Sequence, residues 1–504
     1  MPSSCGEVAH HLVVKRHCGA DRTVVPDRPN ACPRCILSSA VAAHPLDLAV
    51  VVAYAAAMLA FGLYFYFKVE RYSDYYDGGR TWGVWIVGCA VAATNIGAGN
   101  SMGSVAMAYR DGYSAMWYVT LQALAFIPFA YVAVHKIHPL KETTLAEYLE
   151  TRYQSWLRPI SAVALGLATF AILPAQIVGG ATVLTALIGL DYTTAFLVVG
   201  ITLIVYSALG GMPSVTYGDV YQWVLMLGGF LVGVPIFISA AGGLQQVLAG
   251  VPDTHASWWS GATGTWNPPT IAAWLITVVM ARFGSQEWYQ RIRASKSVAA
   301  SRRGFILGGV MAAPFGFLTM LVGIAALQQM PGLANPEEAF ARSMMSAMPV
   351  GLRALMMSAI LAAVVTSGES SVNAATALFV NDVCKPLVPH RSDRFYLRLS
   401  QVSCAGLGLI ALGLALNAPH IVGYIRLGFM IRTPVAITVL MGLYWRGASA
   451  TGAAAAIIVG TAAVLGWQNF GDPQAIDPFW IAAPVTLVAI VLGSLAVPRR
   501  LTPA

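Results

Sequence analysis

Long apolar stretches recur along the chain from Leu46 to Ala496, separated by turns or by clusters of charge. Each stretch is near the ~20 residues that an α-helix needs to cross ~30 Å of hydrocarbon. Charged residues make up only 10% of the 504-residue chain, whereas soluble domains carry about 25%. Because lipid leaves backbone polar groups no water to bind, repeated spans must be helical. The pattern therefore predicts an all-α integral membrane protein.

We expect about thirteen transmembrane helices in this chain, each centred on one apolar stretch. Their ranges are 46–68, 83–107, 114–135, 159–187, 192–209, 221–242, 269–284, 304–328, 354–381, 399–416, 421–441, 449–468 and 479–496. Residues 46–498 then form a single transmembrane domain. Residues 1–45 are polar, and we expect a poorly ordered N-terminal extension there.

The Lys and Arg residues of the connecting loops predict the orientation in the membrane. Nineteen of them, including Arg291, lie in alternate loops that begin with Lys68, while the opposite loops hold only Arg110, Arg342 and Arg353. Loops rich in Lys and Arg face the cytoplasm. We therefore expect a multi-pass cell-membrane protein with its N-terminus outside and its C-terminus in the cytoplasm. The net charge of +8 reflects this topology and not a nucleic-acid partner.

The N-terminal extension has no apolar run of the kind a signal peptide contains. It carries possible zinc ligands, but no second well-spaced cysteine pair completes a zinc site. We therefore favour a disordered tail, or a mistranslated upstream region, over a metal site. The side chains that could have served as zinc ligands are Cys5, Cys18, Cys32, Cys35, His10, His11 and His17.

The second predicted span contains residues that interrupt a helix at its middle. Its centre reads "ATNIGAGNSMG" and holds Asn95 and Asn100 among three glycines. Glycine and asparagine are poor helix formers, and free backbone at membrane depth must line a cavity or be buried in protein. Close helix packing through small residues is the alternative, but it does not explain the asparagines. We therefore predict a broken helix.

The ninth predicted span contains the polar stretch "VVTSGESSVNAAT", residues 364–376. At 100° per residue, one narrow stripe of this helix holds small and hydroxyl side chains, and Glu369 projects from its flank. Such a stripe suits a small, hard cation, and sodium is the natural candidate. The alternative is that each hydroxyl only bonds a carbonyl four residues back. An acid among four hydroxyls favours a functional site. The stripe consists of Ala363, Thr366, Ser367 and Ser370.

Five motifs, in order, resemble those of the sodium/solute symporter family. They are "YDGGRTWG" (76–83), "YSALGGMPSVTYGDVYQ" (206–222), "EWYQRIRASKS" (287–297), "TSGESSVNAATALFVND" (366–382) and "MGLYWRGASATGA" (441–453). The resemblance implies a core of two inverted five-helix repeats, as in leucine-transporter-like folds, with discontinuous helices around a midplane site. The repeats would span 83–242 and 269–441, after a first helix at 46–68 and before two C-terminal helices within 449–496.

The same resemblance implies the site residues. Asp219 matches an acid near the inner end of the sodium exit path, and Glu369 stands where the family more often has Asp. Asn100 and Gln122 match substrate-facing positions of sugar-transporting relatives, with Ser101 beside them, although several residues of the sugar pocket are missing. Sodium is the coupling ion, and no cofactor or other metal is expected. Its ligands would be backbone carbonyls at the break and groups on the ninth span: Ala93, Ile96, Ala363, Thr366 and Ser367.

Arginines within the membrane suggest what the solute is. Arg426 and Arg432 lie in the eleventh span, and Arg282 lies near the inner end of the seventh. A buried arginine can clamp a carboxylate, so we expect Arg426 to contact the solute, which would be an amino acid or small organic acid. The alternative is that these arginines pair with Glu369 or extend to an interface.

Taken together, the sequence predicts a sodium-coupled symporter that imports a small organic solute by alternating access. Its partners would be sodium, the solute and the lipid bilayer, whether as a monomer or a homo-oligomer. A ligand sensor of the same fold that does not transport is the alternative. We do not expect an enzyme, because no metal-ligand spacing or nucleophile–base pairing is found.

Overall fold

The computed structural model describes residues 44–69, 72–416, 421–471 and 476–498. The predictions of a disordered tail or a zinc site within residues 1–43 lie outside these ranges. The described residues form helices and no β-strand, with one isolated bridge between Trp82 and Ser295. The expected all-α architecture is confirmed.

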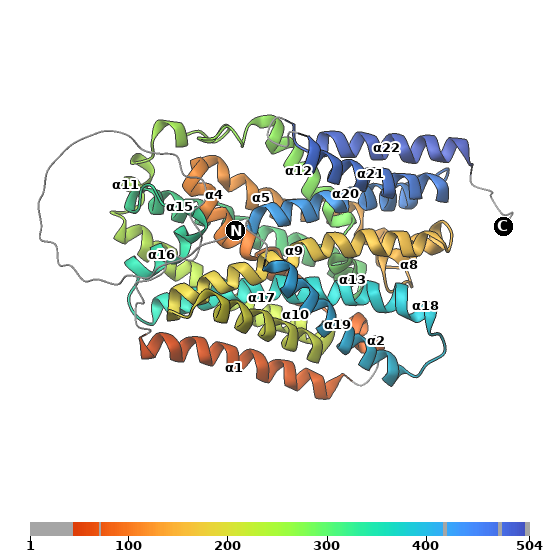
Figure 1. The fold of residues 1–504 in the computed structure, drawn as a ribbon, viewed down its shortest axis with the longest axis horizontal. Coiled ribbons are helices and arrows are strands. Elements are labelled where there is room, and N and C mark those ends of the chain that lie inside the picture. The colour runs from red at the N-terminus through yellow and green to blue at the C-terminus, as the bar shows by residue number, and fades with distance from the viewer. Residues whose placement is uncertain (1–43, 70–71, 417–420, 472–475, 499–504) are drawn as a thin grey trace, which may run out of the picture. The chain divides into compact units, whose positions relative to one another are not determined.

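The long helices lie side by side over much of their length (Figure 1). They are α1 (Pro45–Lys68), α9 (Leu157–Ile188), α10 (Tyr192–Ala240), α17 (Leu352–Leu378), α19 (Asp393–Ala415), α20 (Ile421–Tyr444), α21 (Ala450–Phe470) and α22 (Phe479–Ala496). Shorter helices complete the bundle: α2 (Tyr72–Asp77), α3 (Val84–Asn95), α4 (Ser104–Asp111), α5 (Met116–Leu124), α6 (Phe126–Val132), α7 (Val134–Ile137), α8 (Leu145–Arg152), α11 (Leu244–Ala249), α12 (Pro268–Phe283), α13 (Gln286–Ala294), α14 (Val298–Ala312), α15 (Pro314–Gln329), α16 (Ala339–Ala347) and α18 (Lys385–Leu387).

Ten helical segments in the described part of the chain are long and apolar enough to cross a membrane. The helices α3 and α12 are apolar but shorter, because each is one half of an interrupted span. Within α10, Gly211 has a φ of 57° and separates two helical stretches near the boundary that we predicted. A total of thirteen spans stays a prediction.

The first interruption lies where the sequence predicts a broken helix. α3 ends at Asn95, and Ile96 leaves helical geometry with φ −95° and ψ 86°. The chain then forms a π-helical turn over Gly99–Gly103 before α4 begins. The whole interruption is buried, which is the condition under which irregular backbone is tolerated at membrane depth.

A second interruption separates α12 from α13. After Gly284 the chain is extended at Ser285, with φ −115° and ψ 119°, and α13 follows at once. We expected this charged segment to be part of a connecting loop, and that assignment is wrong, because Gln286–Ala294 is helical. Every residue of α13 is buried, and its Arg291 has partners inside the protein, as described below.

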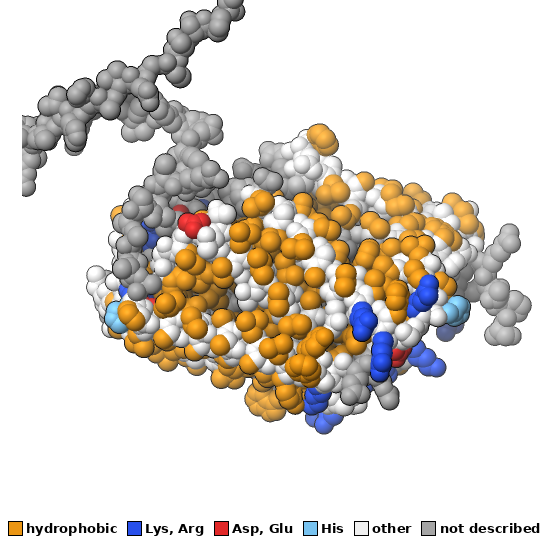
Figure 2. Space-filling view, turned by 60° about the horizontal axis from the view of Figure 1, so that its bottom comes forward, with side chains coloured by type: hydrophobic (Ala, Val, Ile, Leu, Met, Phe, Trp, Pro, Cys, Tyr) orange, Lys and Arg blue, Asp and Glu red, His pale blue; other side chains and the backbone are white. Residues whose placement is uncertain are grey.

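The helix that carries the polar stretch lies at the centre of the bundle. α17 packs against α9, α10 and α1. In the most apolar 18-residue stretch of the segment Leu352–Leu387, 94% of the residues are buried, against 28% in the corresponding stretch of α1 and 33% in that of α22. Figure 2 shows a broad hydrophobic surface, with Lys and Arg side chains gathered toward the end where α1 terminates. Apolar outer helices therefore surround a polar central helix.

Candidate ion and solute site

The break after α3 faces the hydroxyl stripe of α17. The Thr366 hydroxyl donates to the carbonyl of Ala93 at 3.0 Å and to that of Ala363 at 2.9 Å. The Ser367 hydroxyl donates to the carbonyl of Thr94 at 2.8 Å. Two hydroxyl oxygens and carbonyl oxygens from two helices therefore converge at one buried point. Oxygen atoms of this kind are the ligands that hard cations prefer.

Ile96 is the remaining predicted ligand, and it is the buried residue at the break itself. Its N–H bonds to the carbonyls of Ala92 and Ala93, so it belongs to the same turn that Thr366 contacts. Hydrogen bonds thus link four of the five predicted ligands, and the fifth, Ser367, directly follows Thr366 in the chain.

Gly97 leaves room for this convergence. A Cβ atom at this position would lie 2.5 Å from the Ser367 hydroxyl and 2.7 Å from Oε1 of Gln176. We expect Gly97→Ala to displace Ser367 at a cost of about 1 kcal/mol, which weakens sodium affinity roughly fivefold. Sodium titration of the purified protein measures this. Gly166→Ala in α9, where a Cβ would meet nothing within 4 Å, is the control, and equal effects of both changes would contradict the prediction.

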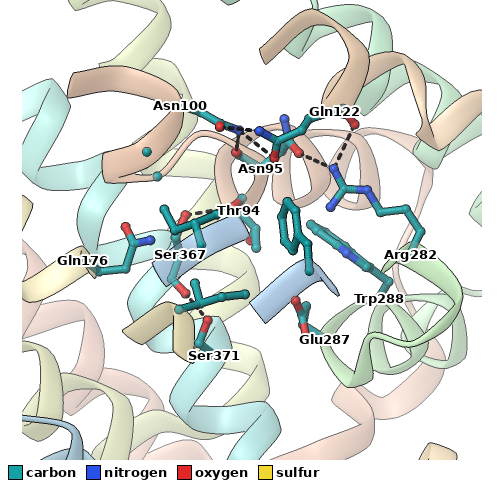
Figure 3. A pocket seen from close by; sticks show the side chains of 15 residues that line it. Thr94, Asn95, Asn100, Gln122, Gln176, Arg282, Glu287, Trp288, Ser367 and Ser371 are labelled. Carbon is teal, nitrogen blue, oxygen red and sulfur yellow. Dashed lines mark hydrogen bonds between the residues drawn. The ribbon is translucent and has the colours of Figure 1, made fainter. Parts of the chain in front are cut away.

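A small cavity of about 40 Å³ lies between the two breaks. Asn95 and Asn100 line it from the first broken helix, and Arg282 and Glu287 line it from the second. Figure 3 shows these side chains around a common space. Ser367 of the cation site also lines the cavity.

Two predicted solute contacts form an amide pair on the cavity wall. Nε2 of Gln122 donates to Oδ1 of Asn100 at 2.7 Å, and Nδ2 of Asn100 donates back to Oε1 of Gln122 at 3.2 Å. Ser101 does not line the cavity, because its hydroxyl donates to the carbonyl of Gly97 at 2.7 Å. Gln176, which we did not predict, lines the cavity and accepts a 2.8 Å hydrogen bond from the N–H of Ala98.

Arg426, which we expected to contact the solute, lies outside the cavity. Its Nη2 atom forms an ion pair with Asp477 at 2.7 Å, and Arg426 is not among the cavity-lining residues. Arg432 pairs with Glu287 at 2.7 Å. Neither arginine therefore takes Glu369 as its partner, which was the alternative. The arginine that lines the cavity is Arg282.

A second polar cluster lies beside the cation site, fully buried. Nη2 of Arg291 bonds to Oδ2 of Asp219 at 2.7 Å and to the hydroxyls of Thr94 and Ser370 at 2.6 and 2.8 Å. The cluster joins α3, α10, α13 and α17. Glu369 is buried nearby, and neither of its carboxylate oxygens has a hydrogen-bond partner among the described residues.

Sequence reasoning missed Arg291, although one signal for it was present. The predicted seventh span, residues 269–284, falls short of the ~20 residues that a crossing requires. The missing length had to come from the residues that follow, which are those of α13. Glu287 and Trp288, which both line the cavity, belong to the same segment and were missed for the same reason.

Discontinuous helices around a buried candidate cation site and a polar cavity are typical of multi-pass membrane transporters. A sequence profile of the sodium:solute symporter family matches residues 75–460. The chain belongs to this family of sodium-coupled solute transporters, and it is not an enzyme.

Curated relatives and a solved structure agree with this family. The sodium/sialic acid symporter of Proteus mirabilis is 25% identical over 90% of this chain and 95% of its own length. The sodium/pantothenate symporter of Escherichia coli is 25% identical over 84% of this chain and 90% of its own length. The structure of a Na+-coupled sialic acid symporter in its substrate-bound outward-open state has the same fold, with a TM-score of 0.79 and 23% identity over 91% of this chain and 100% of that one.

Proposed function

We propose that this protein imports a small organic solute together with sodium by alternating access. The observation that carries the proposal is the shared position of Ser367, which contacts the carbonyl of Thr94 at the candidate cation site and also lines the solute cavity. A bound sodium ion would fix the break that forms one wall of the cavity. Sodium and solute then favour the same conformation, and each raises the affinity for the other.

The residues proposed to bind sodium are the five named from the sequence: Ala93, Ile96, Ala363, Thr366 and Ser367. None of them supplies a charged carboxylate, so we expect loose binding that permits release into a sodium-poor cytoplasm. We propose that Asp219 and Glu369 line the exit path. The contacts of Arg291 support this, because Arg291 of the second broken helix bonds both to Asp219 and to Thr94 of the first, and these contacts would open when the two helices separate.

The proposed orientation places the N-terminus outside the cell and the C-terminus in the cytoplasm. The proposed repeats comprise residues 83–242 and 269–441. Their support is the presence of one broken helix at the start of each, α3 with α4 and α12 with α13, as inverted repeats require.

Uptake by proteoliposomes tests the proposal. We expect at least one solute from a radiolabelled panel of amino acids, carboxylates, vitamins and sugars to accumulate about tenfold or more under an inward sodium gradient, and not when choline replaces sodium. Uptake that is equally fast without sodium would contradict sodium coupling. Sodium-dependent binding with no flux would instead support the alternative, a ligand sensor of the same fold.

A further inference from the structure

We propose that the solute is a monocarboxylate whose carboxylate group binds Arg282. This inference rests on the proposed function, because it names the class of solute that occupies the cavity between the two broken helices. Three observations lead to it: the unpaired charge of Arg282, its position on the cavity wall, and the charge of its neighbours.

Arg282 is a buried cation without an anionic partner. It is 2% exposed in the apolar helix α12, and no described carboxylate forms an ion pair with it. Five other buried or partly buried arginines differ in this respect, because each has a carboxylate partner. Their ion pairs are Arg158 with Asp382 and Glu150, Arg291 with Asp219, Arg353 with Asp47, Arg426 with Asp477, and Arg432 with Glu287.

The surroundings hold the Arg282 guanidinium in place but do not neutralise it. Nη2 donates to Oδ1 of Asn95 at 2.7 Å and to the carbonyl of Gln122 at 2.8 Å. The guanidinium lies over the rings of Phe126 and Trp288, at 4.1 and 5.2 Å from their centroids. Aromatic faces stabilise a cation without balancing its charge. Nε remains buried without a partner.

An arginine in the membrane interior without a counter-charge is costly, and such groups mark substrate pathways. Arg282 lines the cavity, so a solute carboxylate is the anion that reaches it. The guanidinium is already fixed by its two acceptors, which lowers the entropy lost on binding. Charge-assisted contacts between arginine and carboxylate are also among the stronger hydrogen bonds.

The second charged residue of the wall limits the solute to one carboxylate. Glu287 pairs with Arg432 through Oε1, while Oε2 is buried without a partner. Together these three residues carry one net positive charge, which a monoanion balances. A second carboxylate would meet Glu287, and like charges in a dry site repel strongly. Oε2 instead suits a hydroxyl or N–H group of the solute.

Ligand-induced stabilisation of the purified full-length protein tests the inference. The probes are lactate, nicotinate, pantothenate and N-acetylneuraminate, each with its primary amide, together with succinate, glucose and myo-inositol. We expect a monocarboxylate to raise the melting temperature in NaCl, and its amide to require at least about tenfold higher concentration for the same shift. Equal potency of acid and amide, or stabilisation by succinate or the neutral solutes alone, overturns the inference.

Variants of Arg282 assign the preference to this residue. Arg282→Gln should bring the acid-to-amide ratio near one, and because this is a ratio it does not depend on the folded fraction. Arg282→Lys keeps the charge and should keep a preference for the acid. It provides the test if Arg282→Gln does not fold. Arg426→Gln, which removes a guanidinium outside the cavity, is the matched control and should leave the ratio unchanged. An unchanged ratio in Arg282→Gln, or no acid preference in Arg282→Lys, contradicts the inference.

Sodium dependence separates this inference from the proposed function. If a monocarboxylate stabilises the protein equally in NaCl and in choline chloride, sodium coupling fails while anchoring by Arg282 stands. If stabilisation requires sodium but does not distinguish acid from amide, the proposed function stands and the monocarboxylate inference fails.

Discussion

The double substitution Thr366→Ala with Ser367→Ala is expected to raise the sodium concentration at half-saturation roughly a hundredfold. Both hydroxyls contact carbonyls at the break of the first broken helix, Thr366 that of Ala93 and Ser367 that of Thr94. A polar contact to a charged group contributes about 1.5 kcal/mol or more, and loss of two such contacts gives roughly this change in affinity. Sodium-dependent stabilisation of the purified protein measures the effect without the need for a known solute.

Two control variants distinguish ligand loss from general damage to α17. Exchange of the two residues, Thr366→Ser with Ser367→Thr, keeps both oxygens and should change the half-saturation far less. Thr376→Ala removes a buried hydroxyl of the same helix that donates to the carbonyl of Val372, and it should leave sodium binding unaltered. If the double alanine variant keeps its half-saturation, the polar stretch serves only helix packing.

The sequence was sufficient to predict that Thr366 and Ser367 face the same way, because the periodicity of one helix determines it. Thr366 and Ser367 share a stripe of α17 whatever the helix packs against. The first break was predictable for a similar reason, since glycine and asparagine weaken a helix locally. Both features depend on residues close together in the sequence.

Contacts between distant segments were not predictable in the same way. Asp477 lies 51 residues beyond Arg426 in the sequence, and nothing in the pattern of either segment indicates that they pair. Arg282 and Arg426 look equally available as solute anchors until their partners are known. The charge of α13 led to an incorrect loop assignment, because hydropathy does not register that a buried arginine can be neutralised by a carboxylate on another helix.

Arg291→Met is expected to lower the free energy of unfolding by about 3–5 kcal/mol, because it removes one partner of a buried ion pair. Asp219 would lose its 2.7 Å contact with the guanidinium. The nearby Glu369 has no hydrogen-bond partner of its own among the described residues and, as an acid, cannot take the place of the lost guanidinium. Denaturant titration in detergent micelles measures the change. Arg342→Met is the control, because Arg342 pairs with Glu338 on a partly exposed helix face, where such pairs contribute about 1 kcal/mol or less.

A second substitution at Asp219 tests whether the loss in Arg291→Met arises from unpaired charge or from lost packing. Asp219→Asn combined with Arg291→Met removes both charges, and we expect it to recover about half of the stability lost in the single variant. If packing of the long Arg291 side chain were the cause, the double variant would be at least as unstable as Arg291→Met. A recovery in stability without a recovery in sodium-driven uptake would place Asp219 on the ion path as well as in the fold, because asparagine cannot supply the negative charge that an exiting sodium ion would meet.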